Sequence, residues 1–305
     1  MNETKSKTRT EALREALERR YNRLDRIAYR FRQNPASILG LALILMLVLV
    51  ALFAPVIAPY PQDAGYQGDP AVNFDKQLEP PSSEHIFGTD NSGRDIFSRV
   101  VFGTQLSLTL GLTVLAFAIG VGVPVGLVAG YMGGPVSIGL MRIADVFLAI
   151  PPLVIALTVS VALEPSLRNV MLALAVVWWP WYARLVYGEV VSVREEAYVE
   201  ASRGIGASTL QIIFREILPN VLAPVSVKFS LDMGYAIIIG AGLGFLGLGA
   251  QPPTPEWGTM ISQGRAYLPG AWWYSTFPGL AIFIAVLGFN FLGDGLRDML
   301  DTEVN

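Results

Sequence analysis

The chain has 305 residues, of which 52% are hydrophobic and only 15% are charged, with 22 Lys and Arg against 25 Asp and Glu. A soluble globular protein carries about 25% charged residues, so this composition argues against a soluble enzyme, a disordered chain and a basic nucleic-acid binder. The absence of cysteine excludes a disulfide-stabilised secreted domain and a cysteine-based metal site.

Long uncharged runs predict membrane-spanning helices. A helix needs about 20 mostly apolar residues to cross the hydrocarbon core of a bilayer. The predicted spans are residues 37–58, 107–130, 138–162, 169–188, 222–248 and 275–294. The expected fold class is therefore an all-α polytopic membrane protein with six transmembrane helices.

Basic residues are distributed unequally over the predicted loops. The side that holds the two termini carries 16 Lys and Arg, the opposite side carries 5, and Lys228 lies inside a span. The positive-inside rule therefore predicts that both termini are cytoplasmic. The loop at 189–221 is then cytoplasmic as well, and the loops near 60–105 and 249–274 are external.

The N-terminal segment, residues 1–34, carries ten Lys and Arg and five Asp and Glu. Two interpretations are equally open: a basic amphipathic helix on the cytoplasmic leaflet, or a solvated helix with one docked face. The predicted division of the chain is an amphipathic segment (1–34), a first transmembrane helix (35–60), an extracytoplasmic loop (61–104), a five-helix core (105–297) and a cytoplasmic C-terminal tail (298–305).

The cytoplasmic loop at 189–221 is much longer than an ordinary connection. Val199, Ser202, Gly206, Leu210 and Ile213 recur at helical spacing, and Gly204 and Gly206 interrupt the pattern. We predict two short helices separated by a glycine turn. The loop could dock into a groove of a cytoplasmic partner, or it could be a passive connector, and composition alone does not decide between these.

One motif in this loop resembles a known signature. Glu200, Ala201 and Ser202, then Gly206, then Leu218 and Pro219 have the spacing of the EAA motif in permease subunits of ABC importers. The resemblance implies that this segment is a coupling helix in a cleft of an ATP-binding subunit. Ser202 replaces the second Ala of the motif, and Glu216 stands where the family has Ile.

Three further blocks, at residues 85–108, 244–261 and 278–301, resemble the dipeptide/oligopeptide/nickel branch of that family, in its DppC/OppC-like half. Gln105 stands where this branch usually has Arg, and Lys228 is a charge in a span that is usually uncharged. The resemblance implies a type I ABC importer permease in the cell membrane of a prokaryote. The substrate would be a di- or oligopeptide, or alternatively nickel or an oligosaccharide.

The resemblance also implies partners: a second homologous permease subunit, two cytoplasmic ATP-binding subunits, an extracytoplasmic substrate-binding protein and the lipid bilayer, with no nucleic acid. None of the four lysines follows a glycine, so the chain has no Walker A motif. We therefore expect no enzyme activity and no bound cofactor in this chain, with ATP and Mg²⁺ used by the partner ATPase subunits. His85 is the single histidine, so no metal site is expected.

The external block contains a motif of six residues, namely Gly88, Thr89, Asp90, Gly93, Arg94 and Asp95. Asp90 and Asp95 can accept hydrogen bonds from backbone N–H groups and from Arg94 or Arg99. Such bonds would fix the loop over the external mouth of the path, and direct contact with substrate is the alternative role.

Charged residues inside the predicted spans are candidates for functional sites. Lys228 and Asp232 are spaced i,i+4 and can neutralise each other on one helix face, either as a structural pair or lining the path. Arg142 and Asp145 can pair across one helical turn of the third span. An ion-coupled secondary transporter would need such buried charges in an inverted repeat, and the sequence shows no repeat. An intramembrane enzyme would need a catalytic constellation that is not evident.

Two other patterns have plain structural explanations. The glycines of residues 242–247 match G-x-G-x-x-G, but they lie in an apolar run, so they predict close helix packing or a helix break instead of a nucleotide site. The external aromatic residues predict an interfacial belt, or alternatively a platform for sugar or peptide; they are Trp257, Tyr267, Trp272, Trp273 and Tyr274.

Overall fold

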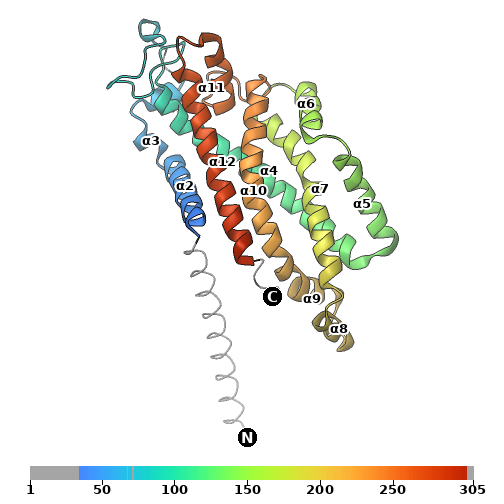
Figure 1. Cartoon of the computed structure of the whole chain (residues 1–305). Coiled ribbons are helices and arrows are strands. Elements are labelled where there is room, and N and C mark those ends of the chain that lie inside the picture. Colours follow the sequence, from blue (N-terminus) through green and yellow to red (C-terminus); the bar gives the residue numbers. More distant parts are fainter. Residues whose placement is uncertain (1–33, 67, 71, 301–305) are drawn as a thin grey trace.

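Long helices make up most of the chain in the computed structural model, which describes residues 34–66, 68–70 and 72–300 (Figure 1). The long helices are α2 (Pro35–Leu52), α4 (Ile96–Met132), α5 (Gly134–Leu148), α6 (Pro152–Ala162), α7 (Leu167–Val193), α10 (Leu218–Phe245) and α12 (Trp273–Leu300). The short ones are α3 (Ala54–Ile57), η1 (Pro61–Ala64), η2 (Phe74–Lys76), α8 (Ala197–Gly204), α9 (Thr209–Ile212), η3 (Ile213–Ile217), α11 (Trp257–Gly264) and η4 (Arg265–Tyr267). The predicted amphipathic segment and the last five residues of the tail lie outside the described residues.

The predicted all-α fold with six spans is confirmed. Five helices are long and apolar enough to cross a membrane, and the bent pair α5 and α6 makes six when it is counted as one span. The prediction of one continuous helix over 138–162 is wrong, because α5 and α6 are bent by 79° relative to each other. Pro151 and Pro152 explain the break, since proline lacks the N–H that would continue the helix and restricts the residue before it.

The centre of the bundle is the contact between α4 and α7, which Figure 1 shows crossing each other. Gly122, Gly126 and Gly130 are spaced by four on α4 and form one face of it. A Cβ on Gly126 would lie 2.6 Å from the Ala183 carbonyl oxygen of α7. Small residues at this spacing let two helix backbones approach closely, which is the main source of packing energy between helices in lipid.

Helices α2 and α12 lie side by side (Figure 1). Their contact also depends on small residues, because a Cβ on Gly40 would lie 2.5 Å from the Leu292 amide nitrogen. At the end of the pair, the Asn34 Nδ2 donates to the Asp298 Oδ2 at 3.0 Å. The first residue of α2 and the last residues of α12 therefore lie at the same end of the bundle, as an even number of spans requires.

Helix α4 is longer than the predicted span. It begins at Ile96 instead of residue 107 and has 37 residues, which makes it about 55 Å long. The hydrocarbon core is only about 30 Å thick, so the first turns of α4 lie in a cap formed with the segment 58–95 and with α11. This cap is at the end of the bundle opposite to α8 and α9 (Figure 1).

Candidate functional site

The segment carrying the EAA-like motif lies at one end of the bundle and projects beyond the long helices (Figure 1). Val199 of α8 is fully buried and packs with Ile212, Ile213 and Ile217 in the main apolar core. Val199 is the one buried side chain of α8, while Glu200 and Ala201 next to it are exposed. Ser202 is half-buried.

Several large apolar side chains of this segment are exposed. Ile205 is 87% exposed and Phe214 is 62% exposed. Tyr198 and Leu210 are exposed as well. Large apolar side chains exposed on one short segment can mark a contact surface for a partner. We call Tyr198, Ile205, Leu210 and Phe214, together with Glu200, the docking face.

Gly206 makes the turn between α8 and the following helix. Its φ is +83°, a left-handed conformation that favours glycine, and nothing lies within 4 Å of a Cβ built there. The next helix begins at once, because the Ser208 side chain caps α9 by accepting from the Gln211 amide. The glycine turn predicted from the sequence is present.

The predicted second short helix is not a separate unit. Residues Thr209–Phe245 form one helix long enough to be a single span. A π-helical turn at Ile213–Ile217 joins α9 to α10, and such a turn adds one residue to a helical cycle. Within it Ile217 is fully buried while Glu216, which stands at the Ile position of the motif, is half-buried.

Two residues that flank the motif form a hydrogen bond that the sequence did not reveal. The Asn220 Nδ2 donates to the Tyr198 hydroxyl at 3.1 Å. Leu218 and Pro219 begin α10 directly before Asn220. The start of α8 is therefore tied to the start of α10, and a displacement of α8 would be transmitted to that helix.

The external motif forms the interior of the cap instead of its surface. The Asp90 carboxylate accepts from the backbone amides of Ser92 and Arg94 and from the Arg94 Nε at 2.8 Å. Arg99 is fully buried with its Nε 3.4 Å from the Asp90 Oδ2. One buried carboxylate therefore lies between two buried guanidinium groups.

Asp95 caps α4 and joins three segments. One carboxylate oxygen accepts from the Ser98 amide and hydroxyl, and the other lies 2.9 Å from the His85 Nδ1. The Asp95 amide donates to the Asp63 carboxylate at 2.8 Å, and burial raises the pKa of Asp63. Gly88 and Gly93 have φ values of +73° and +74° and shape the turns on either side of Asp90, while Thr89 makes an isolated bridge with Asp95.

The second external loop closes over the first. The Trp273 Nε1 donates to the Thr89 carbonyl at 3.2 Å, and the Tyr274 hydroxyl donates to the Asn91 Oδ1 at 3.1 Å. The Trp257 Nε1 donates to the Val100 carbonyl at 3.0 Å. All three rings are buried, so the prediction that they belong to an interfacial belt is wrong, although Trp272 is exposed.

Glu256 is a further buried residue of the cap. Its carboxylate accepts from the amides of Gly258 and Thr259 and from the Thr259 hydroxyl, which caps α11. A Cβ on Gly244 would lie 2.2 Å from the Glu256 Oε2. That glycine of the G-x-G-x-x-G pattern therefore permits a close approach to the cap. Burial raises the pKa of Glu256 despite these hydrogen bonds.

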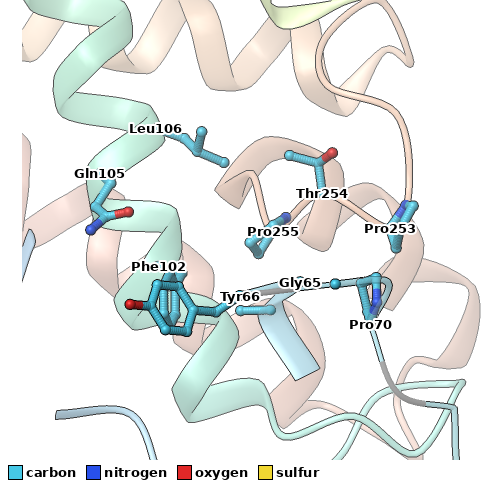
Figure 2. A pocket seen from close by; sticks show the side chains of 11 residues that line it. Gly65, Tyr66, Pro70, Phe102, Gln105, Leu106, Pro253, Thr254 and Pro255 are labelled. Carbon is cyan, nitrogen blue, oxygen red and sulfur yellow. The ribbon is translucent and has the colours of Figure 1, made fainter. Parts of the chain in front are cut away.

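A cavity of about 420 Å³ lies at the edge of the cap (Figure 2). Tyr66, Phe102 and Pro255 are among its lining residues, and Gln105 lies on its α4 side. The Gln105 Nε2 donates to the Ala51 carbonyl at 2.7 Å. This residue, where the resembling branch has Arg, therefore joins α4 to the end of α2.

Charged residues of the spans form two ion pairs, of which the first is mostly buried and the second is more exposed. The Lys228 Nζ lies 3.2 Å from the Asp232 carboxylate on α10, and the Trp178 Nε1 of α7 donates to that carboxylate at 3.1 Å. Asp145 pairs with Arg184 of α7, so the expected pair of Arg142 and Asp145 is wrong. Spacing along one helix predicts only partners on the same helix. Arg184 becomes the partner of Asp145 because α5 packs against α7. Among the residues that the structure describes, no group of three or more His, Asp or Glu could hold a metal ion.

Comparison with known proteins identifies the class. Residues 122–305 match the family described as the binding-protein-dependent transport system inner membrane component. Residues 23–81 match the N-terminal transmembrane domain of oligopeptide transport permease C. The chain belongs to this family of inner-membrane permease components, and the family predicted from the motifs is confirmed.

Individual relatives cover nearly the whole chain. The probable D,D-dipeptide transport system permease protein DdpC of Escherichia coli K12 is 42% identical over 295 residues, which is 96% of each chain. The dipeptide transport system permease protein DppC of Alkalihalophilus pseudofirmus is 43% identical over 275 residues, 90% of this chain and 88% of the relative. The glutathione transport system permease protein GsiD of E. coli is 42% identical over 90% of this chain and 89% of its own length.

The fold is also that of a solved transporter. An inward-facing structure of the MetNI methionine ABC transporter matches with a TM-score of 0.55 and 21% identity, covering 66% of this chain and 96% of that one. At this level of identity the match describes the fold alone, and it agrees with the predicted all-α fold.

Proposed function

We propose that this chain is the permease subunit of an ATP-driven importer of dipeptides or short oligopeptides, and that it forms half of the translocation path. The observation that carries the proposal is the similarity over nearly the whole length to relatives named as dipeptide permeases, at 42–43% identity. A second, homologous permease subunit completes the path, and two ATP-binding subunits and an extracytoplasmic binding protein complete the importer.

The docking face is the contact for one ATPase subunit. Its apolar side chains beside Glu200 support this role, because they are exposed in the described part of the chain and lie at the end of the bundle where basic residues predict cytoplasm. Glu200, Ala201, Ser202 and Gly206 shape the docking helix, and Leu218 and Pro219 begin the span that follows it. This chain contributes no cofactor site, and ATP with Mg²⁺ is used by the partner subunits.

Coupling follows from the way α8 is attached. Closure of the ATPase pair would displace α8, which is held through Val199 and through the bond between Tyr198 and Asn220. The displacement would tilt the helix Thr209–Phe245 and alternate the path between outward-open and inward-open states. ATP can drive this change only if the ATPase contacts differ between the two states.

The external motif holds the cap together for the binding protein. The carboxylates of Asp90 and Asp95 are buried and occupied by hydrogen bonds from the chain itself. This supports a structural role over direct contact with substrate.

The experiment is uptake of a radiolabelled dipeptide by vesicles containing the complete complex with its binding protein. We expect uptake that stops when ATP is removed and continues when ion gradients are collapsed. Uptake driven by an ion gradient without ATP would contradict the proposal and favour a secondary transporter. Uptake of nickel or an oligosaccharide in place of the dipeptide would keep the importer and replace its substrate.

A further inference from the structure

The ion pair of Lys228 and Asp232 forms part of the lining of a cavity of about 280 Å³. The aromatic side chains of α7 and α10 form most of its wall, and the start of α6 borders it. The lining residues are Pro152, Trp178, Trp181, Lys228, Asp232 and Tyr235. Trp181 is 46% exposed and Tyr235 is 52% exposed at its rim, so the cavity opens at the side of the bundle.

Both charged groups retain binding capacity. The Lys228 Nζ has three donors, of which the structure pairs one with the Asp232 Oδ1. The ammonium also lies 5.6 Å from the ring centre of Trp181 and 5.5 Å from that of Tyr182, which stabilises the positive charge. The Asp232 carboxylate accepts from Lys228 and from Trp178 and has lone pairs left for another donor. A ligand can therefore bind to the pair without separating it.

Charge balance selects the kind of ligand. The side chains of Lys228 and Asp232 are only 25% and 12% exposed, and an uncompensated charge in such a site is unfavourable. An added cation or an added anion alone would leave the cavity with a net charge. A molecule with one positive and one negative end adds no net charge. Its ammonium can donate to Asp232 while its carboxylate accepts from Lys228, so that each charge lies beside opposite charges.

The size of the cavity and the side chains that line it limit which zwitterionic molecules can bind. Sites for small molecules usually have about 300–1,000 Å³, and this cavity of about 280 Å³ lies just below that range, so it suits a small ligand. Its walls are mostly aromatic, which suits apolar side chains. A dipeptide has two charged termini at the ends of a short backbone and fits both conditions better than a longer peptide.

We propose that this cavity is a substrate site within the path, which binds the zwitterionic backbone of a dipeptide with its ammonium on Asp232 and its carboxylate on Lys228. The proposal rests on the proposed function, since it assumes that peptides pass through this chain. It adds a site of selection inside the membrane, beyond the one made by the binding protein.

The test measures peptide binding to the purified complex in nanodiscs without its binding protein, by saturation-transfer NMR. The ligands are alanyl-phenylalanine, its C-terminal amide and its N-acetyl derivative. We expect wild type to bind the free dipeptide at least tenfold more tightly than either capped form. Lys228→Met should remove the preference over the amide and keep the preference over the N-acetyl form. Asp232→Asn should do the reverse.

Ratios within one variant do not depend on the fraction of protein that is folded. Lys228→Arg and Asp232→Glu keep the charges and should keep both preferences. If Lys228→Met and Asp232→Asn each weaken the binding of all three peptides equally, the pair is only structural and the proposal is overturned. The proposal is also overturned if wild type binds no peptide, or if it binds the free and capped forms equally. If ATP-driven dipeptide uptake persists in that case, the proposed function stands without this site; if wild type imports no peptide, the proposed function fails.

Discussion

Asp90 lies between two buried guanidinium groups in the external cap, those of Arg94 and Arg99. Asp90→Asn keeps the shape of the side chain but leaves both groups buried without their counter-charge. Breaking a buried ion pair on one side costs about 3–5 kcal/mol, so the melting temperature of the purified complex should fall clearly. Glu84→Gln is the control, because the ion pair of Glu84 with Lys76 is at the surface and its loss should not change the melting temperature. Equal effects of the two substitutions would contradict the buried role of Asp90.

The buried carboxyl group of Glu256 should make the stability of the protein depend on pH. Burial raises its pKa in the folded state, so the folded protein holds the proton more tightly than the unfolded chain does. The resulting stability is fully present below the unfolded pKa and is lost as pH rises through the folded pKa. As pH rises above about 4, the ordinary range of a glutamate pKa, the melting temperature of wild type should therefore decrease relative to that of Glu256→Gln. A difference between the two proteins that stays constant with pH would contradict the raised pKa of Glu256.

At the residue scale, the sequence predicts local partners better than distant ones. The hydrogen bonds of Asp90 with Arg94 and of Lys228 with Asp232 join residues four apart and can be expected from spacing. The pair of Asp145 with Arg184 joins two helices, and the Tyr198 bond to Asn220 joins residues 22 apart. Such pairs depend on how the helices pack, which one sequence does not specify.

The contact between α4 and α7 can be tested by adding bulk to one glycine. Gly126→Leu would place a side chain where the Ala183 carbonyl oxygen is 2.6 Å from a Cβ. Overpacking of this kind costs about 1–3 kcal/mol or more, so folded yield and melting temperature should fall. Gly120 is on the same helix with nothing within 4 Å of a Cβ, and Gly120→Leu should be tolerated. The prediction is wrong if Gly126→Leu is as stable as Gly120→Leu.

The turn between α8 and α9 should control coupling. Gly206→Val forces a branched residue into a left-handed conformation, at a cost of roughly 1–2 kcal/mol, and should misorient α8. Gly204→Val is the control, because Gly204 also has open space around a Cβ but no positive φ. We expect Gly206→Val, and Glu200→Lys on the docking face, to reduce dipeptide uptake strongly while ATP hydrolysis and membrane insertion persist. Normal uptake in both variants would remove the coupling role.

At the element scale, hydropathy located every span but not its ends or its breaks. The runs of uncharged residues identify the membrane segments, because lipid contact requires them. They do not show that α4 begins at Ile96, since its first turns contain Arg99 and are buried by the cap instead of by lipid. The prediction that Trp257 and Trp273 lie in an interfacial belt was wrong because a buried cap and a membrane interface both favour large rings with one polar atom.

At the scale of the whole molecule, the two ends of the bundle differ in a way that fits transport. The cap end is closed by buried ion pairs and by indole and hydroxyl hydrogen bonds between two loops. The opposite end exposes apolar side chains on α8, a helix attached at few points. Under the proposed function, a firm cap and a loosely attached α8 would allow an ATPase bound at α8 to move the spans without disrupting the cap.

Cysteine labelling can test this orientation, because the natural chain contains no cysteine and single cysteines can be introduced without a background. Phe74 of the cap is 68% exposed and Ile205 of the docking face is 87% exposed. A membrane-impermeant maleimide should label Phe74→Cys from outside intact spheroplasts and should label Ile205→Cys only after permeabilisation. The reverse pattern would invert the topology and would place the docking face out of reach of any cytoplasmic ATPase. Labelling of Ile205→Cys in permeabilised membranes should also decrease when the ATPase subunits are present, because the proposed contact covers that residue.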